Sequence, residues 1–93
     1  MNEIARELVK KTLENIYRFA EMSAKLTKLI EVYEVDEKIL KAMIYLADDI
    51  EHDMDKLGIS DSFVLKRILA ERDDCEMFLG DMADVTPGAG EHK

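Results

Sequence analysis

The side chains most able to do chemistry lie between Asp48 and Asp55, where the sequence reads DDIEHDMD. This segment holds five carboxylates around His52, one of two histidines in the chain. Carboxylate oxygens bind hard cations, and imidazole can ligate a metal or move a proton, so these residue types suit a metal or acid–base site. On a helix, however, His52 lies about 170° from the centre of the nearest apolar seam. The spacing therefore favours a solvated acidic face that includes His52 and Asp49.

A carboxylate further along the chain offers a more specific hypothesis. Glu71 falls on an apolar seam, where burial of a carboxylate is costly unless something pairs with it. In an antiparallel hairpin about Gly58, Glu71 lies level with Asp48. One interpretation is an ion pair between Glu71 and Arg67, one turn away on the same face. The other is a hydrated Mg²⁺ or Mn²⁺ ion with oxygen ligands from Asp48, Glu51, Glu71 and Asp74.

The metal hypothesis resembles the all-α nucleoside-triphosphate pyrophosphohydrolases. Their metal is held by adjacent acids, a third acid one turn on, and a later E-x-x-D on the next helix. Here Glu71-Arg-Asp-Asp74 supplies the E-x-x-D, whereas Asp48, Asp49 and His52 stand where three glutamates are expected. The resemblance implies a Mg²⁺- or Mn²⁺-dependent phosphohydrolase.

The order of the helices suggests another family. A long helix, a shorter one and a third that opens with LGISDSFVLKRIL look like the all-α chorismate mutases. That resemblance implies an enzyme that surrounds a dianionic substrate with cations from two chains. The residues available for this are Arg6, Arg18, Lys38 and Lys41, and the net charge of -8 opposes an anionic substrate.

The elements that would position these residues are all helical. No Gly or Pro occurs before Gly58, which predicts long helices and an all-α fold. We predict a break near Val35 with Asp36 as the N-cap, the alternative being one unbroken helix of about 55 residues. Gly58 should end the second helix, and Ser60 or Asp61 should cap the third. Residues 1–85 should form a single helical domain, followed by a flexible tail of residues 86–93.

Three apolar seams follow from the spacing of hydrophobic residues. The first comprises Ala5, Val9, Thr12, Ile16, Phe19, Ser23, Leu26, Ile30 and Tyr33. The second comprises Leu40, Met43, Ala47, Ile50, Met54 and Leu57. The third comprises Val64, Ile68, Glu71, Cys75, Phe78 and Met82.

The first helix is predicted to be long and central, and its apolar arc is wider than one seam. The third helix carries a second stripe, formed by Leu65, Leu69, Leu79 and Ala83. Because exposure of so much apolar surface is unfavourable, we expect the three-helix bundle to be completed by an antiparallel or intertwined homodimer. The alternative is that the first helix is kinked and folds back on its own domain. The predicted contact residues are Tyr45, Leu65, Leu69 and Met77.

Charge and composition exclude several classes of partner. Residues 1–34 are neutral, so the acidic excess lies beyond Tyr33 and opposes binding to nucleic acid or anionic membranes. The longest apolar run, AMIYLA, is too short to span a bilayer. Cys75 has no second cysteine with which to form a disulfide. We therefore expect a cytoplasmic protein. We predict a small acidic adaptor or regulatory module that is not an enzyme and needs no cofactor. We predict that the chain binds a second copy of itself. Another protein, basic in charge, is a further candidate partner.

Overall fold

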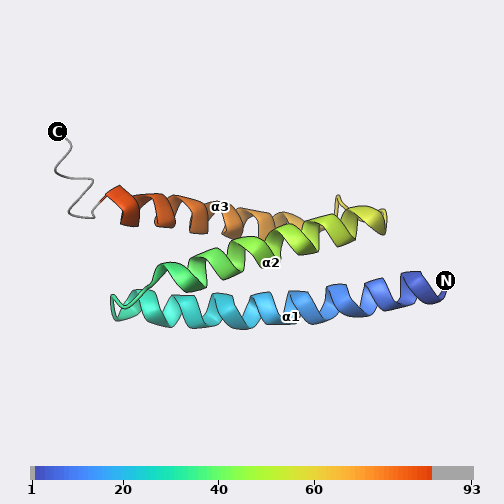
Figure 1. The fold of residues 1–93 in the computed structure, drawn as a ribbon, viewed down its shortest axis with the longest axis horizontal. Coiled ribbons are helices and arrows are strands. Elements are labelled where there is room, and N and C mark those ends of the chain that lie inside the picture. Colours follow the sequence, from blue (N-terminus) through green and yellow to red (C-terminus); the bar gives the residue numbers. More distant parts are fainter. Residues whose placement is uncertain (1, 85–93) are drawn as a thin grey trace.

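The computed structural model describes residues 2–84, which form three α-helices and no strand. The helices are α1 (Glu3–Glu31), α2 (Glu37–Lys56) and α3 (Phe63–Asp84). The predicted all-α fold is therefore confirmed, while the predicted tail, residues 86–93, lies outside the described residues. Figure 1 shows α2 between α1 and α3, and the N-terminal part of α1 extends beyond the turn that joins α2 to α3.

The break between α1 and α2 lies where the sequence predicts it. The Asp36 side chain accepts hydrogen bonds from the backbone N–H groups of Lys38 and Ile39, at 2.9 and 3.2 Å. These two bonds satisfy N–H groups that lack a partner within the first turn of a helix. The alternative of one unbroken helix is therefore wrong.

The α1 and α2 helices end in the same way but with different residues. After α2, the Gly58 and Ile59 N–H groups donate back to Asp55 and Met54, and Gly58 has φ +75°, as predicted for a left-handed C′ position. After α1, the same two hydrogen bonds form, but the left-handed position holds Tyr33, with φ +57°. Glycine adopts this conformation without a steric penalty, whereas tyrosine does not.

The start of α3 corrects one prediction. Neither Ser60 nor Asp61 caps the helix. The Ser62 hydroxyl accepts a hydrogen bond from the Val64 N–H at 3.2 Å, and the Ser62 carbonyl accepts one from Lys66. The turn after Gly58 is thus longer than predicted, because the Ser62 N–H also bonds back to Ile59.

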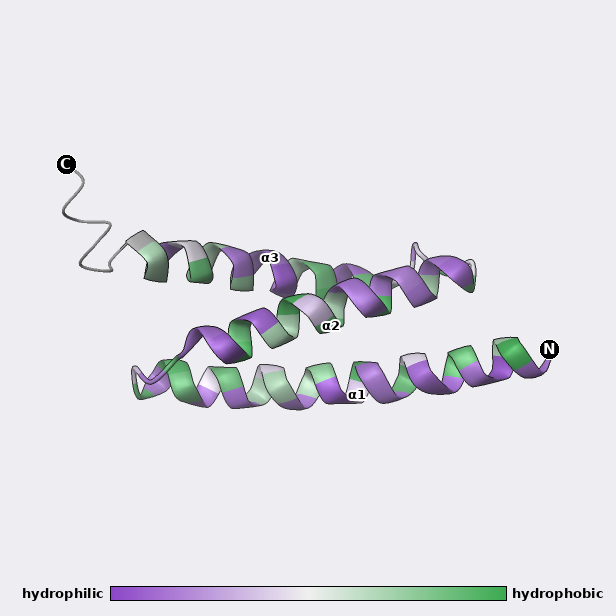
Figure 2. Cartoon of the chain, in the orientation of Figure 1, coloured by the Kyte–Doolittle hydropathy of each residue, from purple (hydrophilic) through white to green (hydrophobic). Residues whose placement is uncertain are grey.

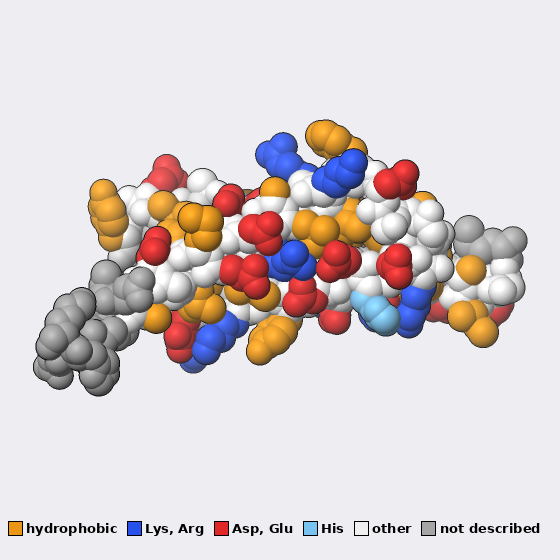
Figure 3. Space-filling model, turned by 90° about the horizontal axis from the view of Figure 1, so that it is seen from above, with side chains coloured by type: hydrophobic (Ala, Val, Ile, Leu, Met, Phe, Trp, Pro, Cys, Tyr) orange, Lys and Arg blue, Asp and Glu red, His pale blue; other side chains and the backbone are white. Residues whose placement is uncertain are grey.

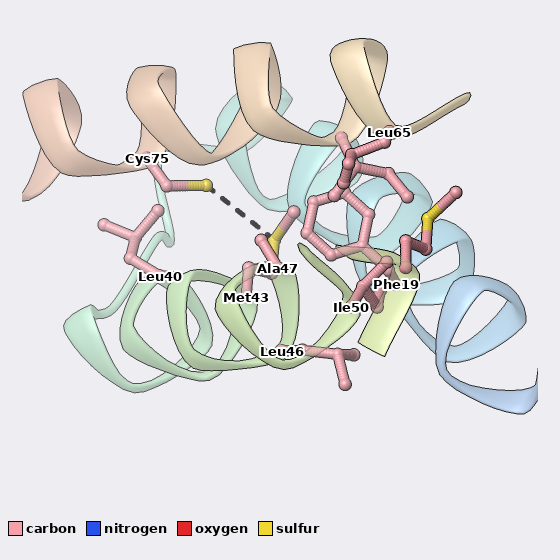
Figure 4. Close-up of a cluster of buried hydrophobic side chains, with 10 residues drawn as sticks. Phe19, Leu40, Met43, Leu46, Ala47, Ile50, Leu65 and Cys75 are labelled. Carbon is pink, nitrogen blue, oxygen red and sulfur yellow. Dashed lines mark hydrogen bonds between the residues drawn. The ribbon is translucent and has the colours of Figure 1, made fainter. Parts of the chain in front are cut away.

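The hydrophobic core is centred on α2 rather than on α1. Six of the ten buried apolar residues in the described range belong to α2, and α1 contributes only Phe19. Figure 4 shows these side chains meeting between the helices, with the Cys75 thiol 4.0 Å from the Met43 sulfur. The predicted seam of α2 is confirmed except at its end, since Leu57 is half-buried. The core residues are Phe19, Leu40, Met43, Leu46, Ala47, Ile50, Met54, Leu65, Ile68 and Cys75.

The buried face of α3 differs from the predicted seam. Leu65, assigned to the second stripe, is only 1% exposed, whereas Val64 on the predicted seam is 45% exposed. Leu69 and Leu79 also pack against the core. Apolar residues surround so much of α3 that spacing alone does not select one face, and packing against α2 turns the helix toward the second stripe.

Much of the apolar surface of α1 stays uncovered. Its buried residues in the structure are Thr12, Asn15 and Phe19, two of them polar. Hydrophobic residues nevertheless recur along its whole length (Figure 2). Within residues 2–84, none of the three helices combines the length and apolar character needed to cross a membrane.

Candidate functional site

An arginine from α3 pairs with two carboxylates of the acidic face of α2. Arg72 Nη1 lies 2.9 Å from Asp48 Oδ1 and 3.2 Å from Glu51 Oε1, and Nη2 lies 3.4 Å from Asp73 Oδ1. The hydrogen bond with Asp48 and the charges around it raise the pKa of Arg72 despite partial desolvation. Two of the four predicted metal ligands are therefore engaged by a permanent cation.

The other two predicted ligands, Glu71 and Asp74, face a different part of the molecule. Glu71 accepts a hydrogen bond from the Ser23 hydroxyl of α1, and it forms no ion pair with Arg67. Glu71 and Asp74 line a depression beside α1 rather than the α2 face. Because neighbouring helical residues differ by about 100° in direction, Arg72 takes the place facing α2 that Glu71 was expected to occupy.

No group of three or more His, Cys, Asp or Glu side chains among residues 2–84 converges as a metal site would require. Of the four predicted ligands, Asp48 and Glu51 lie on α2 beside Arg72, whereas Glu71 and Asp74 lie on the part of α3 beside α1. His52 and Asp49 are exposed, as their position opposite the α2 seam predicts. Figure 3 shows a histidine and many acidic side chains at the surface, with basic side chains among them.

The α1–α2 contact contains a charged pair that the sequence does not reveal. Asp53 is only 2% exposed, and Lys11 Nζ lies 3.0 Å from its Oδ2 oxygen. Thr12 and Asn15, both buried polar residues of α1, belong to the same helix surface as Lys11. A general preference for opposite charges could not have selected this pair, because Lys11 also has Glu7 one turn away on its own helix.

Cys75 is the remaining reactive group, and it is buried at 3% exposure. Burial raises the pKa of its thiol, and the charges of Glu71, Asp74 and Glu76 add to the effect. A high pKa disfavours the thiolate, which is the nucleophilic form. Cys75 is therefore a core residue, as the sequence predicts.

A groove lies between α1 and α3 in the described chain. The two helices both pack on α2 and make few direct contacts with each other, of which the Ser23–Glu71 hydrogen bond crosses the floor of the groove. Four adjoining depressions follow the groove, and neighbouring ones share residues such as Ile16, Ser23 and Ile30. The groove begins beside Leu57 and Ile59 near the α2–α3 turn and ends near Met82.

The half of the groove nearest that turn is lined mainly by apolar side chains. Tyr17 and Leu13 on α1 are 72% and 52% exposed, and Phe63 and Val64 on α3 are 79% and 45% exposed. Each of these residues lines one of the two depressions in this half. Clustered exposed apolar residues of this kind mark surfaces that bind another molecule. The wide apolar arc of α1 was the sequence feature that pointed here, but it did not identify α3 as the other wall.

The predicted contact residues do not line this groove. Leu65 lies in the core at 1% exposure, so its assignment as a contact residue is corrected, because packing turns it toward α2. Leu69 is partly buried against the core, and its role in binding stays a prediction. Tyr45 and Met77 are 70% and 69% exposed, which agrees with their predicted positions away from the seams. Their role in binding stays a prediction.

Comparison of the chain with protein-family models, with curated proteins and with solved structures finds no match.

Proposed function

We propose that the chain is a small protein-interaction module whose α1/α3 groove receives a helix from another chain, and that it acts as a homo-oligomer. The observation that carries the proposal is the groove itself, walled by the exposed side chains of Tyr17 and Leu13 on one side and Phe63 and Val64 on the other.

A fourth helix would suit this groove for two physical reasons. The α1 and α3 helices run in the same direction on either side of α2 (Figure 1), so a helix between them completes a four-helix arrangement. Apolar side chains at the groove would then lose contact with water, which is the main favourable contribution to association between proteins. The amphipathic helix laid into an apolar groove is a recurrent mode of protein recognition.

Sedimentation velocity over micromolar concentrations tests the proposal. Wild-type chain should sediment above the monomer mass of 10.7 kDa. Tyr17→Glu should shift it to the monomer, because it places a charge among the apolar residues of the groove. Since Tyr17 is exposed, circular dichroism should show unchanged helicity in this variant.

The chain provides a matched control in Tyr45, which is as exposed as Tyr17 but lies outside the groove. Tyr45→Glu should leave the assembly intact. A wild-type monomer at all concentrations contradicts the proposal. Loss of assembly in Tyr45→Glu, with none in Tyr17→Glu, would place the interface on the other face of the molecule.

A further inference from the structure

One face of α1 beside the groove carries an exposed stripe of apolar residues. Leu13, Tyr17, Ala20 and Ala24 are spaced by four, three and four residues, and all are exposed. This spacing places them in one row along the helix, which is the pattern of a helix that packs against another helix. The two alanines are small enough to allow close approach of the second backbone.

The α3 wall of the groove carries two charges of opposite sign. Arg67 and Asp74 both line the groove and are exposed, and they stand seven residues, or about two helical turns, apart. Neither forms an ion pair within residues 2–84. They can therefore pair with charges brought by an occupant of the groove.

The α1 helix carries the complementary pair with the same spacing. Glu21 and Lys28 are also seven residues apart, are exposed, and form no ion pair in the described chain. They lie about 60° around α1 from the apolar stripe, on the side turned away from the helix's own α3. A helix packed through the stripe would present these charges to the α3 of another copy.

The hydrogen bond between Ser23 and Glu71 sets the relative height of α1 and α3. Because α1 and α3 run in the same direction, Arg67 lies near the height of α1 residue 19 and Asp74 near that of residue 26. In a parallel pair of α1 helices, residues with the same number share a height. The partner's Glu21 and Lys28 then come within about 3 Å of the heights of Arg67 and Asp74.

An antiparallel pair does not give this match. If Glu21 of the partner subunit stood opposite Arg67, the reversed chain would bring the partner's Glu14 opposite Asp74, and two carboxylates would face each other. The two-fold axis of an antiparallel pair is perpendicular to the α1 helices, and it would bring both α3 helices to the same side of the α1 pair. The two-fold axis of a parallel pair runs along the α1 helices, and it places the two α3 helices on opposite sides.

From this complementarity we infer that the occupant of the groove is α1 of a second copy, parallel to the first α1 and related to it by a two-fold axis along the helices. The stripe residues then meet their own copies on the axis, and each α1 lies against the other copy's α3. Arg67 pairs with Glu21 of the partner subunit, and Asp74 pairs with Lys28 of the partner subunit. This inference rests on the proposed function, since it specifies which helix binds the groove and in which direction.

Disulfide cross-linking under mild oxidation tests the direction. Leu13→Cys and Ala24→Cys are separate variants at exposed positions, eleven residues apart, and wild-type chain is the control because Cys75 is buried. Each variant alone should give a covalent dimer that reductant reverses. An antiparallel two-fold can bring only one height of α1 against its own copy, so disulfide formation by both variants excludes it.

A mixture of the two variants separates failure of this inference from failure of the proposed function. Cross-linking between Leu13→Cys and Ala24→Cys chains, with none in either variant alone, shows an antiparallel pair and overturns the inference while the groove remains an interface. An assembled wild type with no cross-link in any combination also overturns the inference. A wild-type monomer by sedimentation overturns both.

Charge reversal tests the pairing across the interface. Arg67→Glu and Glu21→Arg should each weaken the dimer by about three- to tenfold in dissociation constant, because each breaks two symmetry-related ion pairs. The double variant should regain most of the wild-type affinity. Lys66→Glu, the same charge change one residue away on the side of α3 turned from the groove, should have a smaller effect. Equal losses in Lys66→Glu, or no recovery in the double variant, would overturn the pairing.

Discussion

Replacement of Tyr33 by glycine should stabilise the fold. Tyr33 follows α1 at φ +57°, and its N–H donates to the Ile30 carbonyl at 3.1 Å while the Glu34 N–H donates to Leu29 at 2.9 Å. These two hydrogen bonds require a left-handed residue between them. Because the Tyr33 side chain is 95% exposed, its removal costs little packing.

The size of the effect follows from two opposing contributions. A left-handed conformation costs a residue with a Cβ roughly 1–2 kcal/mol, which glycine avoids. Glycine in turn loses about 0.5–1 kcal/mol more conformational freedom on folding. The difference lies between about 0 and 1.5 kcal/mol, so Tyr33→Gly should raise the free energy of unfolding by roughly 0.75 kcal/mol. For a chain of this size, that corresponds to a rise in melting temperature of about 3–6 °C.

Thermal unfolding by circular dichroism measures the change, and two alanine variants isolate its cause. Tyr33→Ala keeps the backbone strain and should lie near wild type. Gly58→Ala introduces the same strain after α2, where a Cβ at φ +75° would meet no atom within 4 Å. It should lower the free energy of unfolding by about 1 kcal/mol, solely through the backbone. Equal melting temperatures for Tyr33→Ala and Tyr33→Gly, or a loss of stability in Tyr33→Gly, would show that the left-handed backbone at residue 33 does not destabilise the fold.

Four further predictions concern the hydrophobic core, the Lys11–Asp53 pair, the Cys75 thiol and the carboxylates beside Arg72. Urea unfolding should show that Leu65→Ala lowers the free energy of unfolding by about 2–5 kcal/mol, and Leu69→Ala by less, because only Leu65 is fully buried. Small and nearly equal losses in the two variants would contradict the placement of Leu65 in the core. Lys11→Met should lower the free energy of unfolding by about 1–3 kcal/mol, because it leaves the buried Asp53 carboxylate without its cation. An unchanged urea midpoint would show that the Lys11–Asp53 pair contributes nothing to stability. The raised pKa of Cys75 means that the folded chain holds the thiol proton more tightly than the unfolded chain. This contribution to stability should be complete below a pH of about 8.5 and be lost as the pH rises through the folded pKa, and Cys75→Ala should remove that part of the pH dependence in thermal melts. Millimolar Mn²⁺ should leave the melting temperature unchanged, because Arg72 already engages two of the four predicted ligands, Asp48 and Glu51. A clear rise in melting temperature would favour the phosphohydrolase hypothesis.

The predictions that succeeded rest on local physical chemistry. Asp36 caps α2 and Gly58 ends it because both effects depend only on a side chain and the backbone next to it. The α2 seam was also predictable, since its apolar residues recur on one face at helical spacing. His52 is exposed for the same reason.

The candidate site was less predictable because its residues come from different helices. Whether Glu71 met Arg67 or faced Asp48 depended on the rotation of α3, and the structure shows a third outcome, a hydrogen bond with Ser23. Arg72 was not singled out at all, since its partners Asp48 and Glu51 lie more than twenty residues away in the chain. The α3 wall of the groove was missed for the same reason, as Leu65 was assigned outward and Val64 inward.

The helical character of residues 2–84, the bounds of α2 and its buried face follow from the sequence alone, because they depend on propensities, caps and one clear periodicity. The face of α3 that meets α2, the central place of α2 and the groove between α1 and α3 depend on how the helices pack together. The sequence does not fix that packing, because α1 and α3 both have apolar residues around more than half of their circumference. Several rotations of such helices bury similar apolar area, and packing against α2 selects among them.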